Sequence, residues 1–158
     1  MKNYLSGKLI ILGICISTAI CAHGAKDDPN IDLIKARKGE MYVRHLSAGP
    51  LFEMAKGNMP YDAEVAGKLA NNLKILTSLE MASAWPAGTG IDKYPDNTHA
   101  LPEIWSTWPK IAESGKQYKE AVDALADNAA QSLEQLRSTI GDLGNACKGC
   151  HDDFMEPH

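Results

Sequence analysis

The chain has 158 residues, of which 44% are hydrophobic, with 16 Lys and Arg against 20 Asp and Glu and a formal charge of −4 at pH 7. This length suits a single domain with one hydrophobic core. The acidic balance argues against nucleic acid or an anionic membrane surface as a partner, since both carry the same sign of charge.

The N-terminus has the pattern of a secretory signal peptide. Lys2 and Lys8 form a basic start, residues 9–20 are almost wholly apolar, and small residues follow them. The apolar stretch is too short for a membrane span, so we expect no stable membrane insertion. We therefore expect residues 1–24 to be removed and residues 25–158 to form one domain in the periplasm.

Two details of this segment leave alternatives. Cleavage after Gly24 fits the small residues there, and cleavage after Ala22 is the second choice. Cys21 also allows a lipoprotein signal, although Ile20 before it is bulkier than such signals favour. Residues 1–24 hold two of the 16 basic residues and none of the 20 acidic ones, so the rest of the chain has a formal charge of −6.

Two helices are predicted after the signal segment. The first begins at Asp28-Pro29, an N-cap followed by proline at the first helical position, and Gly49-Pro50 predicts a break or kink before a short continuation to Ala55. The second begins at Asp62 and is amphipathic. Its apolar positions recur every three or four residues: Val65, Leu69, Leu73, Leu76 and Leu79.

Two more helices follow a loop rich in Gly, Pro, Asp and Asn. The third is predicted from Leu101-Pro102 to Asn128, with Pro109 in its tight first turn or at a small kink. The fourth begins at about Ser132. Its inner stripe is Leu133, Leu136, Ile140, Leu143, Cys147, Cys150 and Phe154. Four helices with mostly short connections, and no stretch of period two, predict an all-α antiparallel four-helix bundle.

The string Cys147-Lys148-Gly149-Cys150-His151 has the spacing at which a c-type haem is attached. Two thiols one helical turn apart match the two vinyl groups of the porphyrin, and the imidazole of His151 can bind the iron. A C-x-x-C pair can also be a redox couple or half of a zinc site. Here the pair lies near the end of a helix, and no other cysteine remains after residue 24. We therefore expect one covalently attached haem c.

A haem motif near the C-terminus of a four-helix bundle resembles the class II cytochromes c, which include the cytochromes c′ and their low-spin relatives. The resemblance covers essentially the whole chain after the signal segment. It is carried by Arg37-x-x-x-Met41, Lys56-Gly57, Pro60-Tyr61-Asp62, Leu101-Pro102-Glu103-Ile104-Trp105 and residues 144–154. These strings together are far more specific than the haem motif alone.

The resemblance implies that Met41 decides the sixth coordination position of the iron. In cytochromes c′ an apolar side chain of the first helix blocks this position and the five-coordinate iron binds NO or CO, whereas in the low-spin relatives a methionine binds the iron. Arg37 lies one turn before Met41 on the same face and is expected to approach a haem propionate. His45, one turn after Met41, is a rival ligand. Met155 stands four residues after His151, where many members have Arg or Lys.

The leading hypothesis from the sequence is a periplasmic mono-haem electron carrier, not an enzyme, with low-spin iron between His151 and Met41. Such ligation favours Fe(II). Its partners would be periplasmic redox proteins, and the resemblance implies a homodimer through the first two helices.

The alternative is a five-coordinate protein that binds NO or CO, with Met41 near the iron but unbound. A third hypothesis, peroxidase-like chemistry, needs an open iron and a distal acid–base residue, for which His45 is the only candidate.

Overall fold

The computed structural model of the chain describes residues 28–157, and the predicted signal segment lies outside them. This part is helical, without a β-strand, and carries one 3₁₀ turn, η1 (Ala82–Ala84). Its helices are α1 (Pro29–Lys56), α2 (Ala63–Leu76), α3 (Glu103–Ser106), α4 (Trp108–Asn128) and α5 (Leu133–Phe154). The prediction of an all-α fold is confirmed.

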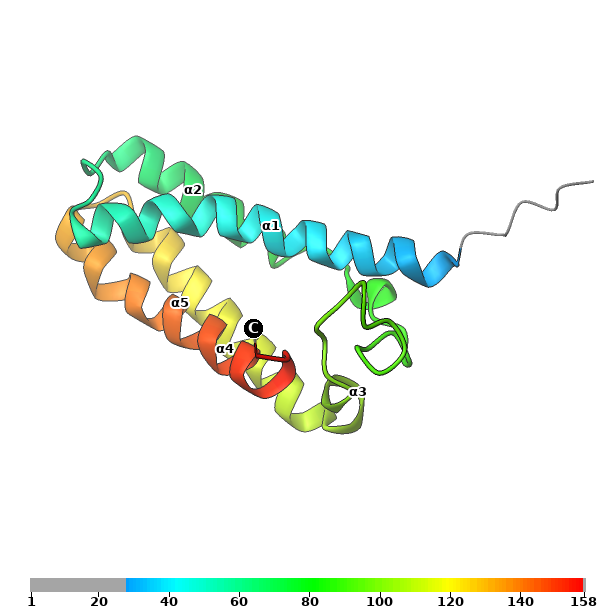
Figure 1. The fold of residues 1–158 in the computed structure, drawn as a ribbon. Coiled ribbons are helices and arrows are strands. Elements are labelled where there is room, and N and C mark those ends of the chain that lie inside the picture. The colour runs from blue at the N-terminus through cyan, green and yellow to red at the C-terminus, as the bar shows by residue number, and fades with distance from the viewer. Residues whose placement is uncertain (1–27, 158) are drawn as a thin grey trace, which may run out of the picture.

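Four of these helices form a bundle around one core (Figure 1). α1 packs against α2 and α5, and α4 packs against the same two helices, so the four close into a ring. The most deeply buried core residues are less than 2% exposed. They include Leu51, Leu73, Val122, Leu125, Leu136 and Leu143. Each helix thus buries one apolar stripe against two neighbours, as a four-helix bundle requires.

Three of the predicted helix starts carry side-chain caps. The carboxylate of Asp28 accepts a hydrogen bond from the Asn30 backbone N–H at 2.9 Å, and that of Asp62 accepts from Val65 N–H at 3.0 Å. The Ser132 hydroxyl accepts from Gln135 N–H at 3.1 Å. These bonds satisfy backbone donors that the first helical turn leaves without a partner.

Of the predicted break or kink at Gly49-Pro50, the break does not occur, because α1 continues through Pro50 to Lys56. Proline has no N–H to donate to the carbonyl of Leu46. Leu46 is 68% exposed, so water can solvate that carbonyl. Beyond the proline, Leu51 and Met54 are buried, and their packing keeps the last turns of α1 on the core.

The inner stripe of α2 includes the predicted Leu73 and the partly buried Leu69, but not Val65. Val65 is 41% exposed, whereas the small residues Ala66 and Ala70 are fully buried beside Leu73. A Cβ added at Gly67 would lie 3.0 Å from the Cβ of Ala130. The close approach of the segment around Ala130 therefore favours small residues on the inner face of α2. The helix also ends at Leu76, before the predicted Leu79.

The predicted third helix is divided in two. α3 ends at Ser106, and α4 begins at Trp108 with Pro109 in its first turn. The backbone of Thr107, between them, is not helical. Proline has no N–H to donate back into a preceding helix, and it suits the first turn of a new one. Pro109 therefore marks the start of α4, consistent with the predicted tight first turn.

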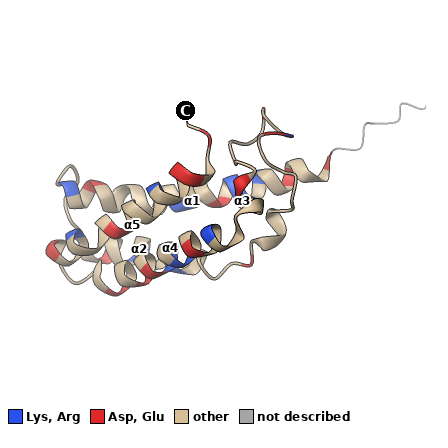
Figure 2. Ribbon diagram, turned by 90° about the horizontal axis from the view of Figure 1, so that it is seen from below, with Lys and Arg blue, Asp and Glu red and all other residues tan. Residues whose placement is uncertain are grey.

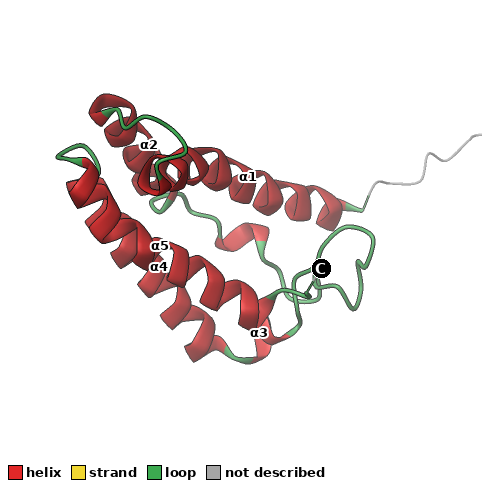
Figure 3. Cartoon of the chain, turned by 60° about the vertical axis from the view of Figure 1, so that its left-hand side comes forward, coloured by secondary structure: helices red, strands yellow, loops and turns green. Residues whose placement is uncertain are grey.

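The long connection between α2 and α4 lies at the end of the bundle where α5 ends (Figure 3). Leu101 N–H donates to the carbonyl of Phe154 at 2.9 Å, and Glu156 N–H donates to the carbonyl of His99 at 2.9 Å. Ala100 and Met155 form an isolated antiparallel bridge between these contacts. The connection is therefore fixed to the C-terminal end of α5, directly beyond the haem motif.

Acidic and basic residues are interspersed along the helices (Figure 2). Many form pairs three or four residues apart on one helix, such as Lys68 with Glu64 at 2.5 Å. Among residues 28–157 we find no helix with the length and apolar character that crossing a membrane would need.

Candidate functional site

The two cysteines of the C-x-x-C-H string lie on α5, one helical turn apart. Both are partly buried, and Cys147 packs against the hydrophobic core. His151 follows in the last turn of the helix and is exposed. A redox pair of the thioredoxin type would lie at the start of a helix, whereas this pair lies near the end of one. Within the described residues no group of three or more His, Cys, Asp and Glu gathers to hold a metal ion, so a zinc site has no support.

Burial and the charge of Arg44 act on the pKa of the two thiols in opposite directions. Burial raises the pKa of both Cys147 and Cys150, while the charge of Arg44 acts in the opposite direction on each. A buried thiol with a raised pKa stays protonated at neutral pH, so it is a poor thiolate nucleophile. Arg44 belongs to α1. The site therefore combines α5 with a charged side chain of the first helix.

Arg44 is held by two neighbours, Glu40 and Tyr118. Its Nη2 donates to Glu40 Oε1 at 2.5 Å, and its guanidinium carbon lies 4.4 Å from the centroid of the Tyr118 ring. The Glu40 side chain is only 6% exposed. Burial raises the pKa of Tyr118, while the Arg44 charge lowers it. Glu40, Arg44 and Tyr118, which we call the Arg44 cluster, thus connect α1 with α4 beside the thiols.

Two polar atoms of the Arg44 cluster are buried without a hydrogen-bond partner among the described residues, namely Arg44 Nε and Tyr118 Oη. Buried donors without partners are rare and costly in proteins, so they mark places where a further group is expected. The thiol pair, the imidazole, the apolar core wall and these donors together fit a covalently attached haem c. Cys147, Cys150 and His151 are the residues that would hold it.

Arg37 is almost fully buried, 2% exposed, and is bound to the long connection. Its two terminal nitrogens donate to Thr89 Oγ1 at 2.7 Å, Thr89 O at 2.5 Å, Thr98 Oγ1 at 3.2 Å and Ala84 O at 3.4 Å. The guanidinium also lies over the Trp85 ring, 4.4 Å from its centroid. Burial lowers the pKa of Arg37, although an arginine remains charged at pH 7. The propionate contact stays a prediction, and it would have to use Nε or replace one of these bonds.

Met41 follows Ile34 by seven residues and Arg37 by four, so it shares their face of α1, although it is 37% exposed. The buried residues of α1 are Ile34, Arg37, Glu40, Ser47, Leu51 and Met54. The rival ligand His45 is exposed as well. Met155 is partly buried and pairs with Ala100 beyond the end of α5.

The Arg44 cluster was not identified from the sequence. A signal was present, because positions 37, 40, 44, 47 and 51 follow the three- and four-residue spacing of one helix face. A Glu–Arg pair at i and i+4 on a face that must also bury Leu51 indicates an inward-facing ion pair. Tyr118 carried no comparable signal, since an aromatic residue in an apolar stripe is usually core.

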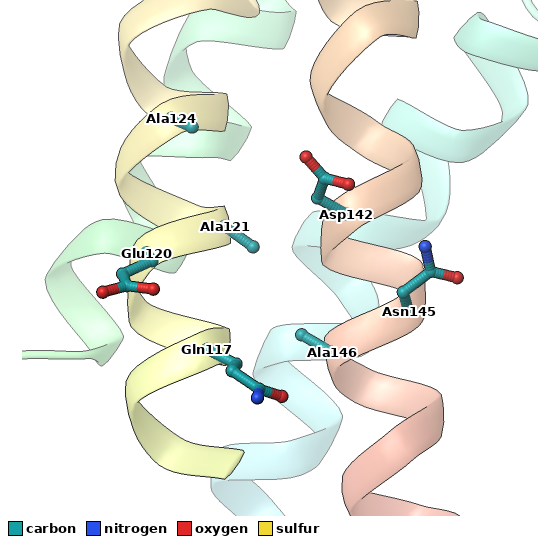
Figure 4. A pocket seen from close by; sticks show the side chains of 7 residues that line it. All are labelled: Gln117, Glu120, Ala121, Ala124, Asp142, Asn145 and Ala146. Atoms are coloured by element: carbon teal, nitrogen blue, oxygen red, sulfur yellow. The ribbon is translucent and has the colours of Figure 1, made fainter. Parts of the chain in front are cut away.

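A shallow groove lies between α4 and α5 on another part of the bundle surface (Figure 4). Its floor is formed by Ala121 and Ala146, and its rims carry the acidic side chains of Glu120 and Asp142. It includes none of the predicted site residues, so it is separate from the candidate site.

Comparison with known proteins gives one consistent family. The family model described as Cytochrome C′ matches residues 32–155. A cytochrome c′ of Cereibacter sphaeroides is 34% identical over 145 residues, which cover 92% of this chain and 95% of the relative. A cytochrome c-554 of the same organism is 35% identical over 133 residues, covering 84% and 86% of the two chains.

Solved structures agree with this result. A cytochrome c′ from Rhodobacter Spheriodes is similar with a TM-score of 0.79 and 36% identity, covering 82% of this chain and 98% of that chain. A variant of cytochrome c′ from Alcaligenes xylosoxidans with bound carbon monoxide has a TM-score of 0.70 and 29% identity, covering 81% and 97%. The alignments therefore include all four bundle helices of this chain.

Proposed function

Since the chain belongs to the cytochrome c′ family, whose members carry covalently attached haem c, we propose that Cys147 and Cys150 bind one haem c and that His151 is an axial ligand. We propose further that the opposite side of the iron is open and takes NO or CO. The bound haem would supply an iron atom with one free coordination position. The thioether bonds to α5 would fix its orientation, and the core packing of Cys147 would keep water from that edge.

The likeness to proteins named cytochrome c′ is the observation that carries this proposal. One such relative is 34% identical over 92% of this chain, and a solved cytochrome c′ is 36% identical with a TM-score of 0.79. A variant of another cytochrome c′, 29% identical to this chain, has carbon monoxide bound. Such a ligand needs an open position at the iron.

This proposal reverses the preference drawn from the sequence. The Met41-ligated electron carrier becomes the second candidate, favoured by one specific observation, which is that a thioether stands at position 41 rather than an inert side chain. In that case the protein would exchange electrons with periplasmic redox proteins. Neither candidate transforms a substrate, and we retain the expectation that the protein is not an enzyme.

Substitution of Met41 separates the two candidates. We expect Met41→Leu to leave the optical spectra unchanged and reduced wild-type protein to bind CO, because an open site needs no sulfur. Met59→Leu, at another exposed methionine outside the helices, is the matched control. A low-spin spectrum that becomes high-spin in Met41→Leu, but not in Met59→Leu, would establish the electron carrier instead.

We also propose that the protein acts in the periplasm, after removal of residues 1–24, as a homodimer. The outer face of α1 supports the dimer, because Tyr42 and Leu46 are both 68% exposed and Val43 is 45% exposed. Large apolar side chains gathered on one helix face are uncommon on monomers and typical of interfaces.

A further inference from the structure

The N-terminal half of α1 is joined to the haem-motif end of α5 through the long connection. We propose that residues 84–101 of this connection act as a spacer that keeps Met41 of α1 from the iron and so keeps the sixth position open. Arg37 and Thr89 are then positioning residues, since they fix α1 to the spacer. The inference rests on the proposed open iron site and adds a structural cause for it.

The spacing of α1 and α5 differs between the two ends of the bundle. The helices lie together at one end and diverge toward the haem motif (Figure 1, Figure 3). At the joined end, Arg137 Nε of α5 donates to Ala55 O of α1 at 2.7 Å. Among residues 28–157, every hydrogen bond that joins residues 29–42 of α1 to a part of the chain after α1 goes to the long connection. The distance between the diverging ends is therefore set through the connection.

Arg37 is the main attachment of α1 to the spacer. Its guanidinium donates to Thr89 Oγ1 at 2.7 Å and to Thr89 O at 2.5 Å, and it lies 4.4 Å from the centroid of the Trp85 ring. The next residue, Lys38, donates from Nζ to Asn97 O at 3.0 Å. Hydrogen bonds from a charged donor are stronger than neutral ones, and Arg37 is only 2% exposed. This half of α1 is thus fixed to the spacer.

The other end of the spacer is attached to α5 directly beyond the haem motif. Leu101 N–H donates at 2.9 Å to the carbonyl of Phe154, three residues after His151. The spacer is also tightly packed within itself, because a Cβ added at Gly90 would lie 3.1 Å from Ala100 O. Densely packed protein resists compression. The two helices therefore cannot approach each other here without breaking these contacts.

The spacer acts on the iron through Met41. This residue lies one turn after Arg37 on the same face of α1, so the two move together as parts of one helix. Because Met41 is 37% exposed, core packing does not fix its side chain, and the position of the helix decides how far its sulfur reaches. A methionine sulfur within reach of haem iron binds it. Weakening the attachment of α1 should thus favour Met41-bound, low-spin iron.

Electron paramagnetic resonance of the ferric holoprotein, which separates high-spin from low-spin iron, tests the proposal. Thr89→Val keeps the shape of the side chain and removes the oxygen that accepts from Arg37 Nη1. We expect the ratio of low-spin to high-spin iron to rise about tenfold, the effect of one hydrogen bond from a charged group. Lys38→Met, which removes the more exposed attachment, should raise the ratio about twofold to threefold.

Two further variants separate positioning from general loss of stability. Tyr61→Phe removes one hydrogen bond, 2.9 Å long, to Ala129 O at the joined end of the bundle. It should lower the free energy of unfolding and leave the spin ratio as in the wild type. The double variant Thr89→Val/Met41→Leu should return to the wild-type ratio, because the new ligand is then absent.

The outcomes separate this inference from the proposed function. Low-spin iron in the wild type would contradict the proposed function, since the sixth position is then filled. A high-spin wild type with an unchanged ratio in Thr89→Val would overturn the spacer alone, as would low-spin iron that persists in the double variant. If Thr89→Val fails to fold, Lys38→Met decides, and an unchanged ratio in that variant overturns the inference.

Discussion

The guanidinium of Arg44 lies 4.4 Å from the centre of the Tyr118 ring, so a charged side chain of α1 covers an aromatic side chain of α4. Beside this contact, α5 presents the two thiols of the haem motif. Three helices of the bundle thus meet at one polar cluster. The hydroxyl of Tyr118, like Arg44 Nε, is buried without a hydrogen-bond partner in the described structure.

We predict that Tyr118→Phe lowers the free energy of unfolding of the holoprotein by about 1 kcal/mol. The Tyr118 hydroxyl is buried without a partner among the described residues, so the haem-loaded protein is expected to supply one, which phenylalanine cannot use. Urea unfolding of the holoprotein measures the effect. An unchanged or raised free energy of unfolding would contradict the expectation of a further group at this hydroxyl.

Arg37 is predicted to be the side chain that fixes the long connection to α1. Arg37→Met removes four hydrogen bonds and leaves buried oxygens of Thr89 and Ala84 without a donor. We expect a loss of about 3 kcal/mol in the free energy of unfolding. Arg137→Met, which removes an exposed arginine with one bond to Ala55 O, should cost less than about 1 kcal/mol. Equal losses in the two variants would contradict the anchoring role.

Gly90 is predicted to tolerate no side chain. A Cβ there would lie 2.9 Å from Asp92 Oδ1, 3.0 Å from the Trp105 ring and 3.1 Å from Ala100 O. Gly90→Ala should therefore lower the free energy of unfolding by about 1 to 3 kcal/mol. Gly115→Ala, in open space on α4, should raise it by about 0.5 to 1 kcal/mol because alanine favours helix. The midpoint temperature of thermal unfolding should thus fall in Gly90→Ala and rise in Gly115→Ala.

Asp28 should contribute to the pH dependence of stability on the acid side. Hydrogen bonds from Tyr94 and from the Asn30 backbone lower its pKa below the usual 3.8. A carboxylate with a lowered folded pKa stabilises the protein above its unfolded pKa, and this contribution is lost as the pH falls through the folded value. Tyr94→Phe removes the larger cause. We expect Tyr94→Phe to weaken the pH dependence of the thermal unfolding midpoint below about pH 4. Between about pH 6 and 8 the pH dependence should stay unchanged.

The proposed homodimer is tested on the outer face of α1. Leu46 is 68% exposed, so Leu46→Asp should not disturb the core, yet it would place a carboxylate inside an apolar interface. We expect light scattering to give a dimer for the wild type and a monomer for Leu46→Asp. Lys116→Glu on α4, a change from an exposed cation to an anion away from the first two helices, should leave the dimer intact. A monomeric wild-type protein at micromolar concentration would contradict the proposal.

Local signals in the sequence predicted the helix starts well. Asp62 and Ser132 cap their helices as expected, because the side chain of a cap bonds to a backbone group only three residues away. Pro50 shows the opposite case. Its effect on α1 depends on the exposure of Leu46 and on the packing of Leu51, which the tertiary structure decides. The same holds for the small residues on the inner face of α2.

The residues of the candidate site also differ in whether a local sequence pattern predicts them. Cys147, Cys150 and His151 follow from spacing along one helix. The partners of Arg37 come from residues 84–98, nearly fifty or more positions away, and no local pattern predicts them. Arg44 meets Tyr118 only because α1 and α4 approach across the bundle. The residues that tune a site in this fold are therefore found from packing rather than from motifs.

The ferric optical spectrum of the purified wild-type holoprotein tests the central claim most directly. We predict the bands of high-spin, five-coordinate haem c, because the proposed function leaves the sixth position open for NO or CO. Sharp low-spin bands with the weak charge-transfer band of a thioether-bound iron would contradict this account and identify Met41 as the second axial ligand.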